Sequence, residues 1–278
     1  MDLDRAREVV RTALDEDLRY GPDATTAATV PADAVAEAAF NTRGEGVLAG
    51  LPLVKLVLDE VVAGYEVLAE RADGDRLAAG DCALRVEAPV RDLLTAERTA
   101  LNLLCHLSGI ATATARWVDA VDGTGCRIRD SRKTLPGLRE AQKYAVRCGG
   151  GVNHRMGLGD AVLIKDNHVV AAGGVVDAVR ACRERAPELP MEVEVGSLDE
   201  LDEVLAEDVS LVLLDNFTPE QCAEAVRRVR SSSPGTELEA SGGLTLDRAR
   251  AYAATGVQYL AVGALTHSSP SLDLGLDM

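Results

Sequence analysis

Charged and small residues follow several apolar runs in the second half of the chain, at points where strands would end. Cations bind anionic groups, carboxylates can hold a divalent metal, and the open N–H groups of small-residue turns bind phosphate. If the strands form a parallel barrel, their carboxyl ends meet at one mouth and create a single site. The residues at these ends are Arg132, Lys133, Lys165, Glu194, Asp215, Ser241, Gly242, Gly243, Gly263 and Ala264.

Positive charge is concentrated in one segment of an acidic chain. Residues 127–168 carry nine basic and four acidic side chains, a net charge of +5, whereas the rest of the chain carries −21. We interpret three of the cations as one solvated helix face, namely Arg139, Lys143 and Arg147. Four others stand at strand ends or in a glycine-rich turn, and we interpret them as an anion-binding group: Arg132, Lys133, Arg155 and Lys165.

Some candidates also have simpler structural explanations. Glu192 and Glu194 share one strand face, and either could pair with a neighbouring cation; we favour Glu194 for function because it is nearer the strand end. Asp215 could cap the following helix, although Thr218 competes for that role. His154 could be a satisfied turn histidine, and the arginine beside it favours a ligand role only modestly.

Three further reactive side chains are assigned to structure rather than chemistry. His106 lies within an apolar helical run and is assigned to packing or an interface. His168 could pair with Asp166. Cys148 has no partner at a reactive spacing, and the glycines that follow it would let the backbone pass close to a bulky group.

The elements that must position the site alternate regularly in the second half. Strand starts roughly two dozen residues apart are typical of successive βα units and favour a parallel barrel. No G-x-G-x-x-G follows a strand, so the dinucleotide-binding signature is missing. The expected strands are 127–134, 161–167, 191–196, 211–216, 237–243 and 259–265, and the expected helices are 175–185, 198–206, 219–229 and 246–254.

The first hundred residues indicate a separate mixed α/β unit. Apolar residues at helical spacing predict a helix from residue 3 that ends before Gly21-Pro22. A long helical pattern over 95–118 leads into the second half. Between them we expect a helix at 51–61 and short strands at 35–40, 47–49, 65–68 and 82–86.

Composition excludes several classes of partner. The chain has 278 residues and a formal net charge of −16, so its surface repels phosphate backbones and anionic lipid. Its longest uncharged stretch, 99–115, is too short and too polar to span a bilayer. The six cysteines show no C-x-x-C spacing, and the charged start lacks the apolar core of a signal peptide. We expect a cytoplasmic protein that binds neither nucleic acid nor membrane.

Several long motifs, in order along the chain, resemble those of the quinolinate phosphoribosyltransferases, a type II phosphoribosyltransferase family. The resemblance is dense from Glu97 onward and looser before it. It includes SRKTLPGLR at 131–139 and KYAVRCGGGVNHR at 143–155. It continues through 163–168, 192–195, 213–216, 239–243 and 262–268, and it begins with 97–102 and 107–112.

The resemblance implies a fold and a reaction. The expected fold is an N-terminal α/β sandwich domain over 1–106, to which the tail 268–278 returns, and an incomplete α/β (TIM-like) barrel over 107–267. Such enzymes are pentosyltransferases that join quinolinate to 5-phosphoribosyl-1-pyrophosphate (PRPP). They release nicotinate mononucleotide, pyrophosphate and CO2 in NAD biosynthesis, they require Mg²⁺, and they work as homodimers with shared active sites.

The resemblance also implies a role for each site residue. Lys133, Lys165, Glu194 and Asp215 would form the catalytic group, with Glu194 and Asp215 facing the ribose and its Mg²⁺. The quinolinate carboxylates would be held by Arg132, His154, Arg155, Lys165 and, from the partner subunit, Arg98. PRPP would contact Ser131, Lys133, Glu194, Asp215, Ser241, Gly242, Gly243, Gly263, Ala264 and Leu265. Ser131 and Gly196 depart from the residues common in the family, and neither departure removes a charge from this set.

Three alternatives remain open at this point. A related phosphoribosyltransferase could use another pyridine carboxylate such as nicotinate, which would not need so many cations. A Schiff-base aldolase could use Lys165 as its nucleophile, although this lysine stands beside Asp166. A barrel without catalytic activity could bind PRPP and leave it unchanged.

Overall fold

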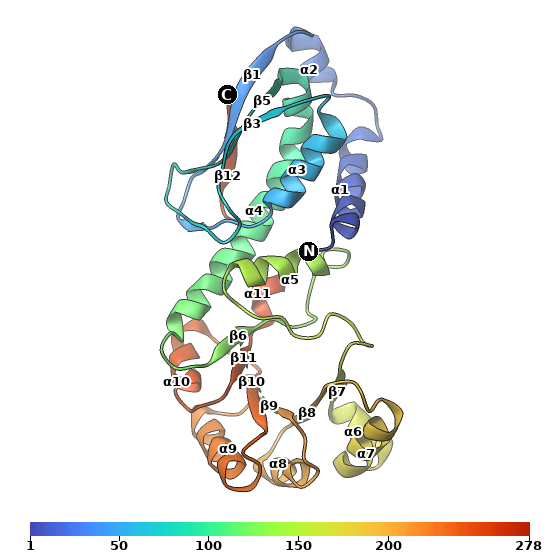
Figure 1. Ribbon diagram of the computed structural model, residues 1–278, viewed down its shortest axis with the longest axis vertical. Coiled ribbons are helices and arrows are strands. Elements are labelled where there is room, and N and C mark those ends of the chain that lie inside the picture. The colour runs from blue at the N-terminus through green and yellow to red at the C-terminus, as the bar shows by residue number, and fades with distance from the viewer. The chain divides into compact units, whose positions relative to one another are not determined.

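The computed structural model describes all 278 residues and divides them into two compact units (Figure 1). The first unit contains residues 1–115, 134–150 and 264–278, and the second contains 116–133 and 151–263. None of the helices combines the length and the apolar composition needed to cross a membrane.

The first unit is built on a four-stranded antiparallel sheet with the order β12-β1-β5-β3. Its strands are β1 (Val35–Thr42), β3 (Glu66–Glu70), β5 (Cys82–Pro89) and β12 (Leu274–Asp277). The last strand comes from the C-terminal tail, which pairs with β1 so that Phe40 faces Leu276. A two-stranded ribbon of β2 (Gly46–Val47) and β4 (Arg76–Leu77) completes the strands of this unit.

Helices α1 (Leu3–Leu18), α3 (Leu51–Val61) and most of α4 (Val90–Ala120) lie alongside this sheet (Figure 1). The unit also contains α2 (Ala24–Thr29), α5 (Arg139–Cys148) and α11 (Ala264–His267). Asp2 caps α1 by accepting from the backbone N–H groups of Asp4 and Arg5. The long helix begins at Val90, earlier than the sequence pattern indicates, because it follows β5 without a loop.

Three segments group differently from the sequence expectation. Residues 107–115, 134–150 and 264–267, expected in the barrel domain, belong to the first unit. Gln142 of α5 is within 2.9 Å of both His106 Nε2 and the Thr266 carbonyl oxygen. A Cβ atom on Gly149 would lie 2.4 Å from the carbonyl oxygen of Ala111 in α4, so only glycine allows this close approach.

The second unit contains six parallel strands with the order β6-β11-β10-β9-β8-β7. The strands are β6 (Arg127–Arg129), β7 (Val162–Ile164), β8 (Met191–Val195), β9 (Leu211–Asp215), β10 (Glu237–Ser241) and β11 (Tyr259–Ala261). The two end strands, β6 and β7, are not paired with each other, so this is the expected incomplete α/β barrel.

Helices follow the strands and line the outer side of the curved sheet (Figure 1). They are α6 (Asp166–Ala172), α7 (Val175–Arg185), α8 (Leu198–Leu205), α9 (Pro219–Ser232) and α10 (Ala249–Ala253), which a 3-10 turn over Leu246–Arg248 precedes. Thr218 caps α9 in a reciprocal box with Gln221, which leaves the neighbouring Asp215 available for other contacts. This capping supports the functional interpretation of Asp215.

Candidate functional site

A cavity of about 350 Å³ lies at the carboxyl ends of the barrel strands, entirely within the second unit. Most of the charged and small residues expected in the site line it, which is the placement that a parallel barrel predicts. The lining residues are Ser131, Arg132, Lys133, His154, Arg155, Leu163, Lys165, Glu194, Leu213, Asp215, Glu239, Ser241, Gly242, Ala261 and Gly263.

Two guanidinium groups form a binding site for anions in this cavity. The Nε atoms of Arg132 and Arg155 are buried and have no hydrogen-bond partner in the protein. Arg155 is held by its Nη1, which donates to the carbonyl oxygen of Ala161 at 2.9 Å. Burial, and then the positive charge of Arg132, lower the pKa of Arg155. Two adjacent cations with unused donors are stabilised by a bound anion, and carboxylates fit the fork of guanidinium donors.

Two carboxylates face these cations across the cavity. Glu194 at the end of β8 forms an ion pair with Lys165 Nζ, and Asp215 at the end of β9 accepts from Asn216 Nδ2 at 2.7 Å. Both side chains are half-buried, so their remaining oxygen lone pairs can face a ligand. Carboxylate oxygens are the ligands that Mg²⁺ takes in proteins, usually together with substrate phosphates and water. The donor set therefore fits Mg²⁺.

The turn after β10 requires glycine at one position. Gly242 has φ = 92°, and a Cβ atom there would lie 2.2 Å from Asn216 Oδ1 and 2.9 Å from the Asn216 backbone nitrogen. Asn216 itself has φ = 58° and donates its backbone N–H to the carbonyl oxygen of Ser241 at 2.9 Å. The ends of β9 and β10 are thus joined tightly, which holds Asp215 and Ser241 at fixed positions beside the cavity.

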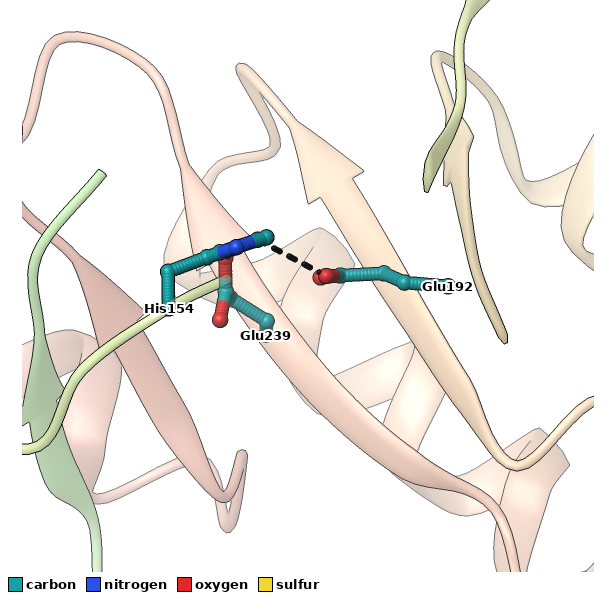
Figure 2. Close-up of side chains that lie close together, drawn as sticks. All are labelled: His154, Glu192 and Glu239. Carbon is teal, nitrogen blue, oxygen red and sulfur yellow. Dashed lines mark ion pairs between the residues drawn. The ribbon is translucent and has the colours of Figure 1, made fainter. Parts of the chain in front are cut away.

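His154, Glu192 and Glu239 lie close together in the barrel (Figure 2), and His154 and Glu239 also line the cavity. His154 Nε2 lies 2.8 Å from Glu192 Oε2, and Arg129 Nη1 donates to Glu239 Oε2 at 2.7 Å. All but Arg129 are buried, and Glu239 is fully so. Burial, and then the charge of Glu192, raise the pKa of Glu239 well above its usual range. We call these four residues the buried cluster.

Several expected residues lie elsewhere. Gly243 does not line the cavity, and Arg98, Ala264 and Leu265 belong to the first unit, where Arg98 is exposed and Leu265 is 1% exposed. Arg98, Ala264 and Leu265 therefore lie outside the unit that contains the cavity. Arg98 in particular is expected to act on the partner subunit's substrate.

One sequence interpretation is wrong. Lys143 was assigned to a solvated helix face, but its side chain is fully buried in α5, while Arg147 is exposed and Arg139 half-buried. The helix turns the face that carries Lys143 inward, together with Gln142 and Val146. Basic residues spaced four apart on a helix therefore did not all lie on its solvated face.

The other reactive residues also have structural contacts, although His168 does not form the expected pair with Asp166. His106 contacts Gln142, and the backbone N–H of Lys165 donates to His168 Nδ1 at 3.0 Å, so His168 serves a helix start instead of an ion pair with Asp166. Cys148 is half-buried, and burial raises the pKa of its thiol to about 11. A thiol with a raised pKa is a poor nucleophile.

Four cavity residues were missed by the sequence analysis. Each stands two positions before a predicted site residue, on the same face of its strand: Leu163, Leu213, Glu239 and Ala261. Because side chains alternate along a strand, the residue two positions before a strand-end ligand points to the same side. This spacing could have identified them.

Comparison with known proteins identifies the family. The quinolinate phosphoribosyl transferase N-terminal domain model matches residues 23–108, and the corresponding C-terminal domain model matches 110–277. The chain is 61% identical over 279 residues to the nicotinate-nucleotide pyrophosphorylase [carboxylating] of Mycobacterium leprae, covering 100% of this chain and 98% of that protein. The human protein of the same name is 38% identical over 260 residues, with 92% and 87% covered. The structure of the nicotinate-nucleotide pyrophosphorylase from Francisella tularensis superposes with a TM-score of 0.94 at 38% identity, covering 100% and 97% of the chains. This chain belongs to the quinolinate phosphoribosyltransferase family.

Proposed function

We propose that this protein transfers the phosphoribosyl group of PRPP to quinolinate, with decarboxylation, and so forms nicotinate mononucleotide, pyrophosphate and CO2 for NAD biosynthesis. The observation that carries the proposal is the pair of buried Nε atoms of Arg132 and Arg155, which have no partner in the protein and lie in a cavity that also holds two carboxylates. A pyridine with two adjacent carboxylates is a small dianion that suits such a pair.

The two substrates would occupy different sides of the cavity. Arg132, Arg155 and Lys165 would bind the quinolinate carboxylates, and Lys133 would lie where the two substrates meet. PRPP would contact Ser131, the turn from Ser241 to Gly243, and Gly263. Gly263 and Ser241 end neighbouring parallel strands, so their backbone N–H groups can serve one phosphate.

Mg²⁺ would be held by Glu194 and Asp215, directly or through PRPP and water, and when bound it supplies positive charge for the departing pyrophosphate. The pair of carboxylates has a second role. As the bond from the ribose carbon to pyrophosphate breaks, positive charge grows on that carbon, and Glu194 and Asp215 are the anions of this cavity nearest the strand ends.

The chemical step needs no side-chain base. The pyridine nitrogen bonds to the ribose carbon as pyrophosphate leaves, and the ring becomes a pyridinium. The carboxylate beside the nitrogen then leaves as CO2, its bonding electrons remain on the ring carbon where the pyridinium charge stabilises them, and a proton from water fills that position. Positioning of both substrates by fixed cations would therefore supply most of the catalysis.

We further propose that the enzyme is a cytoplasmic homodimer in which the partner subunit's Arg98 completes each site. The six cysteines are free thiols, as in proteins of reducing compartments. Arg98 is exposed on the first unit, so it is accessible to another chain. A closed twofold dimer would place both copies of this residue equivalently.

The experiment that tests the function uses purified protein with PRPP and either quinolinate or nicotinate, with and without Mg²⁺. We expect nicotinate mononucleotide from quinolinate only, and only with the metal. The Lys165→Ala protein serves as the control for contaminating enzymes. Turnover of nicotinate with equal efficiency, or binding of PRPP with no product, would instead support a different acceptor or a binding protein without activity.

A further inference from the structure

The ring nitrogens of His154 are both engaged inside the protein. The backbone N–H of Arg155 donates to His154 Nδ1 at 2.7 Å, and His154 Nε2 lies 2.8 Å from Glu192 Oε2. A backbone N–H can only donate, so Nδ1 must offer its lone pair, and the ring proton must be on Nε2, where it is donated to Glu192. In this tautomer His154 has no donor left for a substrate carboxylate.

Glu192 is itself held from several strands. It stands on β8 with its side chain 5% exposed, and Arg129 Nη1 from β6 lies 3.9 Å from its Oε2. The same guanidinium donates to Glu239 of β10 and lies over the ring of Tyr259 of β11, 4.8 Å from the ring centroid. The acceptor that orients His154 is therefore fixed to three strands of the barrel.

From this geometry we infer that His154 is a positioning residue and not a ligand for quinolinate. Together with Glu192 it fixes the backbone at Arg155 and so aims the guanidinium into the cavity. The inference rests on the proposed function, since it assigns how the quinolinate end of the same site is preorganised. The buried cluster orients the imidazole, and the imidazole accepts from the backbone N–H of Arg155. The carbonyl oxygen of Ala161 accepts from the guanidinium of the same arginine. Side chains held in this way orient the groups that bind substrate.

A metal ion is a weaker explanation of the same cluster. His154, Glu192 and Glu239 offer three ligand atoms within 4.8 Å of one another. However, Arg129 already donates to Glu239, and a divalent ion would bring two more positive charges beside this guanidinium. The cluster is better explained as a set of ion pairs and hydrogen bonds that orients the imidazole.

Two substitutions of His154 separate the roles of its nitrogens. The amide oxygen of Asn can take the place of Nδ1 and accept from the Arg155 N–H, whereas the amide of Gln reaches only the place of Nε2. We expect His154→Asn to raise the KM for quinolinate less than about threefold, and His154→Gln to raise it by about tenfold or more, with little change in the KM for PRPP. The reverse order, or equal effects of the two variants, would overturn the inference.

Two substitutions of Glu192 test the next link. Glu192→Gln keeps an oxygen that accepts from Nε2–H, whereas Glu192→Leu removes it and leaves the donor buried without a partner. An imidazole whose Nε2–H has no acceptor turns toward another one, and its Nδ1 then no longer faces the Arg155 N–H, a problem that the Asn variant does not have. The Leu variant should therefore raise the quinolinate KM much more than the Gln variant, and thermal melting would check that both are folded. Equal KM values in two folded variants would contradict the positioning role.

A spectroscopic measurement tests the tautomer in the wild-type protein without any dependence on turnover. Histidine ¹⁵N resonances, assigned by their loss in His154→Asn, should show a protonated Nε2 and an unprotonated Nδ1 both before and after quinolinate is added. Transfer of the proton to Nδ1 on binding would make His154 a ligand and refute the inference. Zinc or another metal retained through dialysis against a chelator, and lost in Glu239→Gln, would also refute it. Failure of the proposed function is distinguishable, because the wild-type protein would then neither bind nor convert quinolinate while the tautomer remained as described.

Discussion

At the residue scale, the unpaired donors of Arg132 and Arg155 define what the cavity binds. Each guanidinium retains a buried Nε without a partner, and the charges of the two groups oppose each other. Unpaired buried donors and the repulsion between two like charges both raise the free energy of the empty site, and a bound anion lowers it. The binding energy for quinolinate should therefore depend on these two residues more than on any apolar contact in the cavity.

Arg155→Ala and Arg132→Ala should each weaken quinolinate binding while PRPP binding changes little. A charge-assisted hydrogen bond to a carboxylate contributes on the order of 1.5–3 kcal/mol, so we expect a loss of roughly tenfold to a hundredfold. Calorimetric titration with each substrate separately measures both affinities. Equal losses for quinolinate and PRPP would show that these arginines do not belong to the quinolinate side.

The buried cluster should make stability depend on pH through Glu239. Its pKa is raised from 4.5 to about 8 by burial and then by the charge of Glu192, so the folded state binds this proton more tightly than the unfolded state. The stability that protonation contributes is complete below pH 4.5 and is lost as the pH rises toward 8. Arg129, His154 and Asp130 are the other charged or titratable groups at this site.

Urea unfolding of the wild type and Glu239→Gln between pH 5 and pH 8 would measure this contribution. The unfolding free energy of the wild type should fall relative to the variant as pH rises, by at most about 1.4 kcal/mol per pH unit for one proton. Groups that do not interact with Glu239 titrate alike in both proteins and cancel in the difference. Parallel curves would mean that Glu239 does not take up a proton on folding.

At the element scale, the strands of the barrel could be predicted from sequence because apolar runs that end in polar residues mark strand ends. The helix expected at 175–185 has those limits in the structure, and each strand expected in the barrel contains the observed one. The pairing of β12 with β1 could not be predicted, because the four residues of β12 pair with residues more than 230 positions away and have no strong local pattern. Lys143 shows a second limit, since charge alone does not tell which face of a helix packs inward.

The strand-end residues of the site could be predicted for the same reason as the strands, but the contacts within the buried cluster could not. Lys165 and Asp215 could be identified because each follows an apolar run, and Glu194 because it stands near the end of its strand. Glu192 and Glu239 stand within strands, where a charged residue is equally consistent with an ion pair in the barrel. Their contacts with His154 and Arg129 depend on bringing separate strands together, which no single segment encodes.

The close packing of α4 against the C-terminal tail makes a testable demand on Gly109. A Cβ atom there would lie 2.2 Å from the Pro270 carbonyl oxygen and 2.8 Å from the Ser271 Cα, and neither backbone atom can rotate away. Gly109→Ala should cost roughly 1–3 kcal/mol and lower the melting temperature. Gly44→Ala is the matched control, because no heavy atom lies within 4 Å of its Cβ position. If both variants melt together, the tail does not pack as described.

At the level of the assembly, the proposed shared site needs two chains. Arg98→Ala and Lys165→Ala homodimers should both be nearly inactive. Mixing them under conditions that exchange subunits should restore one intact site in each heterodimer, about a quarter of the wild-type sites if exchange is random. Mass spectrometry can verify the exchange. If verified heterodimers remain inactive, Arg98 acts within its own subunit or has no role in the site.

The central claim is that one cavity binds a dicarboxylate beside PRPP and removes a single carboxyl group as it joins them. The direct measurement is a single-turnover reaction with PRPP and quinolinate labelled with ¹⁴C in the carboxyl group beside the ring nitrogen. The account predicts one labelled CO2 for each nicotinate mononucleotide, with no label in the nucleotide and equal losses of both products in Arg155→Ala. Label that remains in the nucleotide, or nucleotide formed without CO2, would contradict it.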